Sequence, residues 1–199
     1  MNKFLPIFIL LFSLSFSDEL KTEFTIADSL PKNMPIVKKV FWGEKGIFRN
    51  SFIDPKSRIK ELKIRHNMLQ LHQRLALFTL GCMAYQYNIG YRMIDGNADY
   101  NLHKNLGYFT FGSYMTTASL SIFAPPGMKY TSKKFSSNRL HRYLALVHFS
   151  GMIAQPILGY KTANANGLEE YNNMLDLHQM VGTITLSSYF LAFITTLFK

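Results

Sequence analysis

Four long stretches of the chain contain no Lys, Arg, Asp or Glu, and shorter polar segments separate them. They cover residues 75–91, 105–128, 143–160 and 177–198. Each approaches the length of about 20 residues that an α-helix needs to cross a hydrocarbon core of about 30 Å. Because lipid offers no partner to free backbone groups, such stretches are expected to be helical. The pattern therefore predicts an all-α, multi-pass integral membrane protein whose core, residues 66–199, is a four-helix up-down transmembrane bundle.

The first residues have the pattern of a secretory signal peptide. Lys3 is followed by an apolar run over residues 4–16, and Ser15 and Ser17 are small residues at the positions that a signal peptidase inspects. Cleavage is expected after Ser17, so that residues 1–17 are removed and residues 18–65 form a polar extracytoplasmic tail. An uncleaved anchor helix is the alternative, although thirteen apolar residues fall short of a full span.

The end of the tail and the orientation of the spans leave alternatives open. Residues 57–68 have helical spacing of apolar positions and form either a surface helix or an extension of the first span. An exported tail places the start of the first span outside the cytoplasm, whereas the positive-inside rule favours the reverse. We expect the exported arrangement, in a bacterial cytoplasmic membrane or a eukaryotic secretory-pathway membrane, because the tail is translocated before later charges are made.

A short motif, Leu-His-x-x-(Leu/Val)-(Ala/Gly), occurs near the start of every charge-free stretch. It places a histidine at the same point of four predicted helices: His72, His103, His141 and His178. An ionisable ring is costly in lipid unless it has a partner, and haem iron is a partner that requires paired imidazoles. In an up-down bundle, alternate helices start at the same membrane surface. The motif therefore predicts two haem sites, one with His72 and His141 and one with His103 and His178.

Further residues near the motif are candidates for contact with these haems. A small residue follows each histidine by four positions and is expected to leave room for a porphyrin on the same helical face. These residues are Ala76, Gly107, Ala145 and Gly182. Candidates for binding the haem propionates are Arg74, Arg139 and Arg142 at one haem and Lys104 at the other. His148, two turns beyond His141, is an alternative ligand, a neutral hydrogen-bonding group or a residue that tunes a haem potential.

The third stretch resembles a helix of the cytochrome b-561 family. It contains His141, then Gln155 and Pro156 after fourteen residues and Gly159 close behind, as the family helix does. The resemblance covers roughly residues 66–198 and implies transmembrane electron transfer through two haems b. It implies a lipid bilayer and separate redox donors and acceptors as partners, and it is compatible with an oxidoreductase that reduces ferric iron or a small molecule. The ascorbate-linked members have six helices, against the four predicted here.

Other functions fit the pattern less well. The net charge of +10 suits nucleic acid, but the charges flank the predicted spans, so lipid headgroups and haem propionates are the expected partners and nucleic acid is not. A non-redox protein that binds or transports metal ions through its histidines is one alternative. A zinc site would need three or four ligands at one depth, whereas the predicted topology provides two at each of two depths. A haem-bearing anchor subunit of a redox complex is the other alternative.

Overall fold

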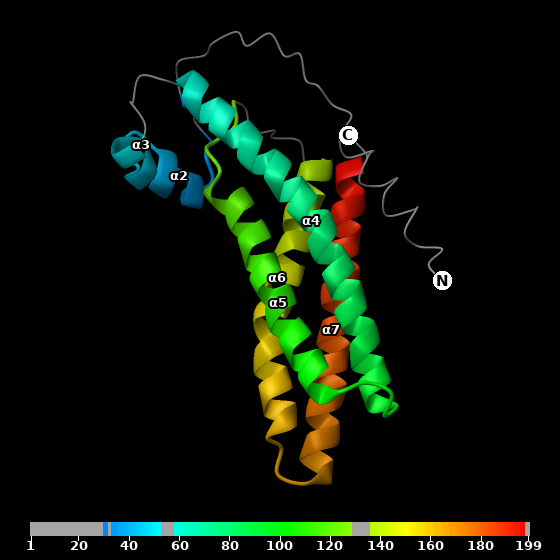
Figure 1. Ribbon diagram of the computed structural model, residues 1–199. Helices are drawn as coiled ribbons and strands as arrows, with labels where there is room; N and C mark the ends of the chain where they lie inside the picture. The colour runs from blue at the N-terminus through cyan, green and yellow to red at the C-terminus, as the bar shows by residue number, and fades with distance from the viewer. Residues whose placement is uncertain (1–29, 32, 53–57, 129–135, 198–199) are drawn as a thin grey trace. The chain divides into compact units, whose positions relative to one another are not determined.

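The computed structural model describes residues 30–31, 33–52, 58–128 and 136–197, and within these ranges the protein is all-α, without a strand (Figure 1). The helices are α2 (Ile36–Trp42), α3 (Ile47–Phe52), α4 (Arg58–Ile94), α5 (Tyr100–Phe123), α6 (Ser137–Ala163) and α7 (Leu168–Leu197). The predicted signal peptide lies outside the described residues. The described chain divides into two compact units: the first takes residues up to 77 and from 116 to 132, and the second takes residues from 78 to 115 and from 133 onward.

Each charge-free stretch falls largely within one of the four long helices, but its ends differ from the ends of the helix, and residues 124–128 of the second stretch follow the end of α5. α4 starts at Arg58 and runs without a break into the first stretch, so residues 58–68 are an extension of that helix and not a separate surface helix. The predicted tail also contains α2 and α3, which are short. Pro35 precedes α2, and the backbone N–H of Gly43 closes it by donating to the Lys39 carbonyl over 2.9 Å.

Among the described helices, α7 is the one that is long and apolar enough to cross a membrane, by length and composition. Its most apolar window has a mean hydropathy of 1.5. The other long helices contain charge-free stretches too, but many Thr, Ser, Gln and Tyr side chains lower their mean hydropathy. The structure therefore supports one candidate span at the C-terminus, and the other three spans stay predictions.

The second unit contains α6, α7 and the parts of α4 and α5 that belong to it. Figure 1 shows α6 and α7 running side by side from a short connection. Gly167 in this connection has a φ of 97°, which glycine adopts at no steric cost. Gln155 contacts His178, and Ser137 hydrogen-bonds to the Thr195 carbonyl, so residue numbers rise along one helix as they fall along the other. α6 and α7 are therefore antiparallel.

The parts of α4 and α5 in this unit are antiparallel as well. Thr79 Oγ1 lies 2.9 Å from Ser113 Oγ, and Gln86 contacts His103 further along α4. Gly96, in the turn that joins the two helices, has a φ of 71°. Because each connection is short, consecutive helices pack against each other in pairs.

α6 and α7 approach each other closely at Gly151. A Cβ atom added there would lie 1.9 Å from Thr185 Oγ1 and 3.1 Å from its Cβ. Backbones come this close only where one side chain is absent, as in helix pairs of membrane proteins. Gly151 therefore fixes the distance between the two helices.

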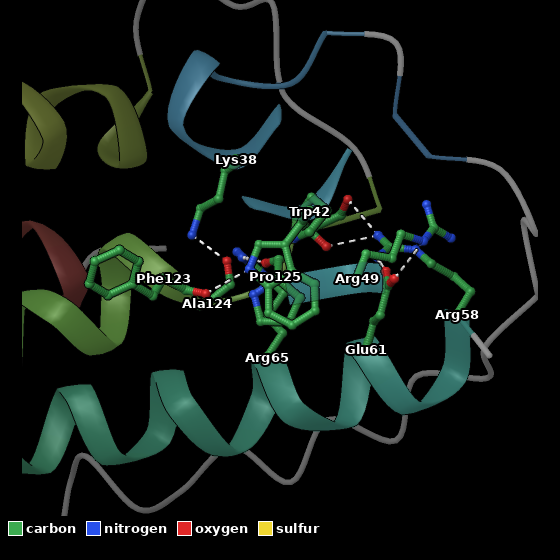
Figure 2. Close-up of polar contacts among 11 residues, drawn as sticks. Lys38, Trp42, Arg49, Arg58, Glu61, Arg65, Phe123, Ala124 and Pro125 are labelled. Atoms are coloured by element: carbon green, nitrogen blue, oxygen red, sulfur yellow. Dashed lines mark hydrogen bonds and ion pairs between the residues drawn. The ribbon is translucent and has the colours of Figure 1, made fainter. Parts of the chain in front are cut away.

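The first unit is joined by side chains that bind backbone carbonyls at and beyond the end of α5 (Figure 2). Lys38 Nζ donates to the carbonyls of Ser121 and Ile122 over 2.8 and 2.9 Å. Trp42 Nε1 donates to the Phe123 carbonyl over 2.8 Å. Since the last carbonyls of a helix have no partner within the helix, these donors cap α5 and attach α2 to it.

Buried ion pairs connect the start of α4 to α3 in the same unit. Glu61 is 1% exposed and pairs with two guanidinium groups, those of Arg58 and Arg49 (Figure 2). The Arg49 Nε atom lies 3.1 Å from Glu61 Oε1. One turn along α4, Arg65 donates to the Pro125 carbonyl over 2.6 Å. Helices α2 and α3, which belong to the predicted polar tail, are thus tied to α4 and to the segment at and after the end of α5.

Candidate functional site

The second unit contains a cavity of about 570 Å³ whose wall comes from α4, α5, α6 and α7. This volume lies in the range of small-molecule and cofactor sites, roughly 300 to 1,000 Å³. His103 of α5 and His178 of α7 both line it. Their ring centroids are 6.3 Å apart and the ring planes make an angle of 74°. The structure therefore brings together the two histidines that the motif predicts as one pair.

The separation of the two rings suits a shared metal atom. A histidine nitrogen binds a metal at about 2 Å. With the radius of the ring added on each side, two imidazoles that share one atom have centres about 6 Å apart. The observed 6.3 Å agrees with this value.

Glutamines on the neighbouring helices hold the two histidine-bearing turns. Gln86 Nε2 of α4 donates to the His103 carbonyl over 2.9 Å, and Gln155 Nε2 of α6 donates to the His178 carbonyl over 3.0 Å. Gln86 Nε2 also lies 3.2 Å from His103 Nδ1. The start of α5 is fixed in addition by Asp99, whose carboxylate accepts from the backbone N–H of Leu102 over 3.0 Å.

The small residues that follow the two histidines lie beside the glutamine side chains of the neighbouring helices. A Cβ atom added at Gly107 would lie 3.2 Å from Gln86 Nε2, and one added at Gly182 would lie 3.5 Å from Gln155 Nε2. Gly107 therefore gives the Gln86 amide space that an alanine would reduce, whereas the distance at Gly182 is that of ordinary van der Waals contact. The expectation that these glycines leave room for a porphyrin stays a prediction.

Two other glycines lie against the imidazole rings. A Cβ atom added at Gly90 of α4 would lie 3.0 Å from His103 Cε1, and one added at Gly159 of α6 would lie 3.4 Å from His178 Cε1. Only the first of these distances is tighter than ordinary van der Waals contact. The backbone of α4 thus restricts the position of the His103 ring more closely than α6 restricts that of His178.

Buried polar atoms of the cavity wall lack partners within the described part of the chain. They are His178 Nδ1, Gln86 Oε1 and Thr110 Oγ1. A buried polar atom without a hydrogen bond costs roughly 1 to 3 kcal/mol, and such atoms are rare in native structures. Their presence beside two opposed imidazoles fits a cavity that receives a ligand.

Of the basic residues predicted to bind propionates, the structure places one at the cavity and the others elsewhere. Lys104 lines the cavity. Arg74 and Arg142 are exposed on α4 and α6 and do not line it. Arg139 lies at the start of α6, where its backbone N–H donates to the Ser136 side chain over 3.2 Å.

The other two motif histidines lie in different units and have equivalent local contacts. His72 Nδ1 lies 2.8 Å from the Thr117 carbonyl in the first unit. His141 Nδ1 lies 3.0 Å from the Ala192 carbonyl in the second. A ring nitrogen beside a carbonyl carries the proton, which leaves Nε2 with the lone pair, as in most metal-binding histidines.

Two residues of the site, Gln86 and Gly90, were not predicted. The signal was present, because Gln86 follows His72 by fourteen residues just as Gln155 follows His141. Within the described ranges, no group of three or more His, Cys, Asp and Glu side chains is arranged to hold a metal ion. Comparison with known proteins finds no matching family model, no matching curated protein and no matching solved structure.

Proposed function

We propose that the protein is a transmembrane electron carrier that binds two haems b within a four-helix bundle, with one haem between His103 and His178. The observation that carries this proposal is the pair of imidazoles from different helices, 6.3 Å apart across a cavity of about 570 Å³. Two imidazoles that approach one iron from opposite sides give the ligation of a low-spin b-type haem. Zinc would require further ligands of the kind that the described residues do not bring together.

For the second haem, the sequence motif supports His72 and His141 as ligands. Each of these rings has its Nδ1 beside a backbone carbonyl, at 2.8 and 3.0 Å. The contact orients the ring and strengthens electron donation from Nε2. The pairing of these two histidines rests on the motif alone, and Arg74, Arg139 and Arg142 stay candidate contacts for the propionates of this haem.

The bound haem would supply reversible one-electron chemistry, and the chain would supply position and environment. His103 and His178 would fix the plane of the macrocycle, and Gln86 and Gln155 would fix the histidines. Lys104 would neutralise a propionate. The buried apolar residues of the wall would exclude water and thereby influence the reduction potential.

The test is a visible spectrum of the purified full-length protein before and after reduction with dithionite, with haem counted against protein. We expect sharp b-type bands and two haems per chain. His103→Ala and His178→Ala should each remove one haem, and the double variant should remove no more than either single variant. His66→Ala is the matched control, because His66 is exposed on α4 and outside the motif.

A colourless protein that takes up no added haem would overturn the proposal. So would two haems retained in both His103→Ala and His178→Ala. Loss of both haems in either variant, with helix content unchanged by circular dichroism, would contradict the assignment of separate ligand pairs.

A further inference from the structure

The helices of the cavity carry the same residues in the same order, counted from their motif histidines. After His103 and after His178, the fourth residue is Gly, the seventh is Thr and the eleventh is Tyr. After His72 and after His141, the eleventh residue is Met, the fourteenth is Gln, the eighteenth is Gly and the nineteenth is Tyr. α4 thus corresponds to α6, and α5 corresponds to α7.

The contacts repeat along with the residues. The glutamine of the first helix in each pair donates to the histidine carbonyl of the second, over 2.9 Å in one pair and 3.0 Å in the other. The atom nearest to a Cβ added at the first-helix glycine is the histidine Cε1 in both pairs, and the atom nearest to a Cβ added at the second-helix glycine is the glutamine Nε2 in both. Two copies of one helical hairpin therefore form the cavity, related by an approximate two-fold rotation.

The identical residues extend over most of the polar wall. Besides the histidines, glutamines and glycines, the equivalent pairs that line the cavity are Met83 with Met152, Tyr91 with Tyr160, and Thr110 with Thr185. The equivalent pairs of the wall that differ are Phe111 with Leu186, Lys104 with Gln179, Tyr87 with Pro156, Ile94 with Ala163, and Tyr100 with Leu175. A flat ligand placed between His103 and His178 thus meets the same histidine, glutamine, glycine and threonine groups on both of its faces.

We infer that this cavity is a two-fold site that accepts haem b in two orientations, reversed face to face. The inference rests on the proposed function and concerns how the site recognises its ligand. Haem b is not symmetric, because its vinyl and methyl groups differ between the two halves of the ring. Reversal exchanges these groups but brings one propionate to the place of the other, so Lys104 can pair with a carboxylate in either orientation.

The inference depends on the difference in free energy that the cavity wall creates between the two haem orientations. Two orientations differ in population by tenfold only if their free energies differ by about 1.4 kcal/mol. Exchanging a vinyl and a methyl group between equal surroundings changes almost nothing. The pairs that differ, among them Phe111 with Leu186, are the asymmetry that can favour one orientation.

The experiment is proton NMR of the oxidised His72→Ala variant, which is proposed to keep only the haem of this cavity. The ring methyl groups of a low-spin ferric haem resonate outside the protein envelope. We expect two sets of methyl signals with populations within about tenfold of each other. A synthetic haem with identical halves should give one set, and Phe111→Leu should change the ratio of the two populations of haem b.

A single set of signals from haem b, in this variant and in Phe111→Leu, would overturn the two-fold site while leaving haem binding intact. A protein that binds no haem at all would instead overturn the proposed function, and the optical spectrum separates this case from the others.

Discussion

The phenolic oxygen of Tyr114 lies 2.6 Å from Nδ1 of His148. Both side chains are buried in the second unit, with 2% of Tyr114 and 8% of His148 exposed. The equivalent tyrosine of the other hairpin, Tyr189, hydrogen-bonds to Thr79, and Thr79 follows His72 by seven residues as His148 follows His141. Thr79 and His148 therefore occupy equivalent positions and hydrogen-bond to equivalent tyrosines.

This equivalence predicts that His148→Thr leaves haem binding unchanged. Threonine at this position would meet Tyr114 as Thr79 meets Tyr189, so no buried phenol is left without a neighbouring oxygen. We expect two haems per chain in His148→Thr and one in His141→Ala, measured by haem content of the purified variants. Loss of a haem from His148→Thr together with full retention in His141→Ala would show that His148 is the ligand.

A second prediction concerns the contact between α6 and α7. Gly151→Ala places a methyl group where Thr185 already lies, and both the Oγ1 and the Cβ of Thr185 are too close to avoid it by rotation. Such overpacking costs about 1 to 3 kcal/mol. Thermal loss of helix, followed by circular dichroism in detergent, should therefore occur at a lower temperature in this variant.

The matched control for this variant is Gly112→Ala in α5. Gly112 has no atom within 4 Å of an added Cβ. Because alanine favours helix over glycine by about 0.5 to 1 kcal/mol, this variant should be as stable as the parent or more stable. Equal effects of the two substitutions would contradict the account of Gly151.

A third prediction compares the glycines that lie against the two imidazoles. Gly90→Ala brings a methyl group to 3.0 Å from His103 Cε1, whereas Gly159→Ala brings one to 3.4 Å from His178 Cε1. The first ring must move and the second need not, so only Gly90→Ala should disturb ligation. We expect loss of haem to an excess of a haem-scavenging apoprotein to be about tenfold faster in Gly90→Ala, which corresponds to about 1.4 kcal/mol, and unchanged in Gly159→Ala. Equal rates in the two variants would refute this reading of the cavity wall.

The long helices were predictable because charge-free stretches of this length have few alternatives to helix. The ends of these helices were not predictable. A lack of charged residues indicates an apolar environment, but it does not show where the backbone hydrogen bonds of a helix stop. α4 begins at Arg58, well before the charge-free stretch at residue 75, because Glu61 and Arg65 stay within the helix and bind groups of the first unit. α2 and α3 were missed since Pro and Gly limit each to two turns or fewer.

The site was predictable where one residue type recurs at one spacing. His103, His178 and Lys104 were identified from the motif and all line the cavity. Gln86 was missed because its partner is a backbone carbonyl on another helix, and no single-helix pattern reveals such a contact. The contact of Gly107 with Gln86 was missed for the same reason, since Gln86 belongs to α4.

A fourth prediction concerns the buried charges of the first unit. Glu61→Gln removes the negative charge that two buried guanidinium groups share. Breaking a buried ion pair in this way costs about 3 to 5 kcal/mol. Trp42 is the single tryptophan of the chain and lies in the same unit, so its fluorescence should report unfolding at lower denaturant concentration. Glu44→Gln, at an exposed position near α2, is the control and should leave the transition where it is.

The last prediction concerns pH and Lys38. Burial, and to a smaller extent the nearby Arg65 cation, lower the pKa of Lys38 from 10.5 to about 8. Between pH 8 and 10.5 the unfolded chain therefore holds a proton that the folded chain has released, so the free energy of unfolding rises with pH over this interval. Below pH 8 both states hold the proton, and this dependence disappears.

Lys38→Met removes the titrating group, so the difference in free energy of unfolding between parent and variant should grow in favour of the parent from pH 8 to 10.5 and stay constant below pH 8. Denaturation of the full chain in detergent, followed by Trp42 fluorescence, measures this difference, and Lys45→Met is the control because Lys45 is exposed. The prediction fails if the parent and Lys38→Met show parallel pH profiles, since Lys38 would then titrate at its ordinary value in the folded protein.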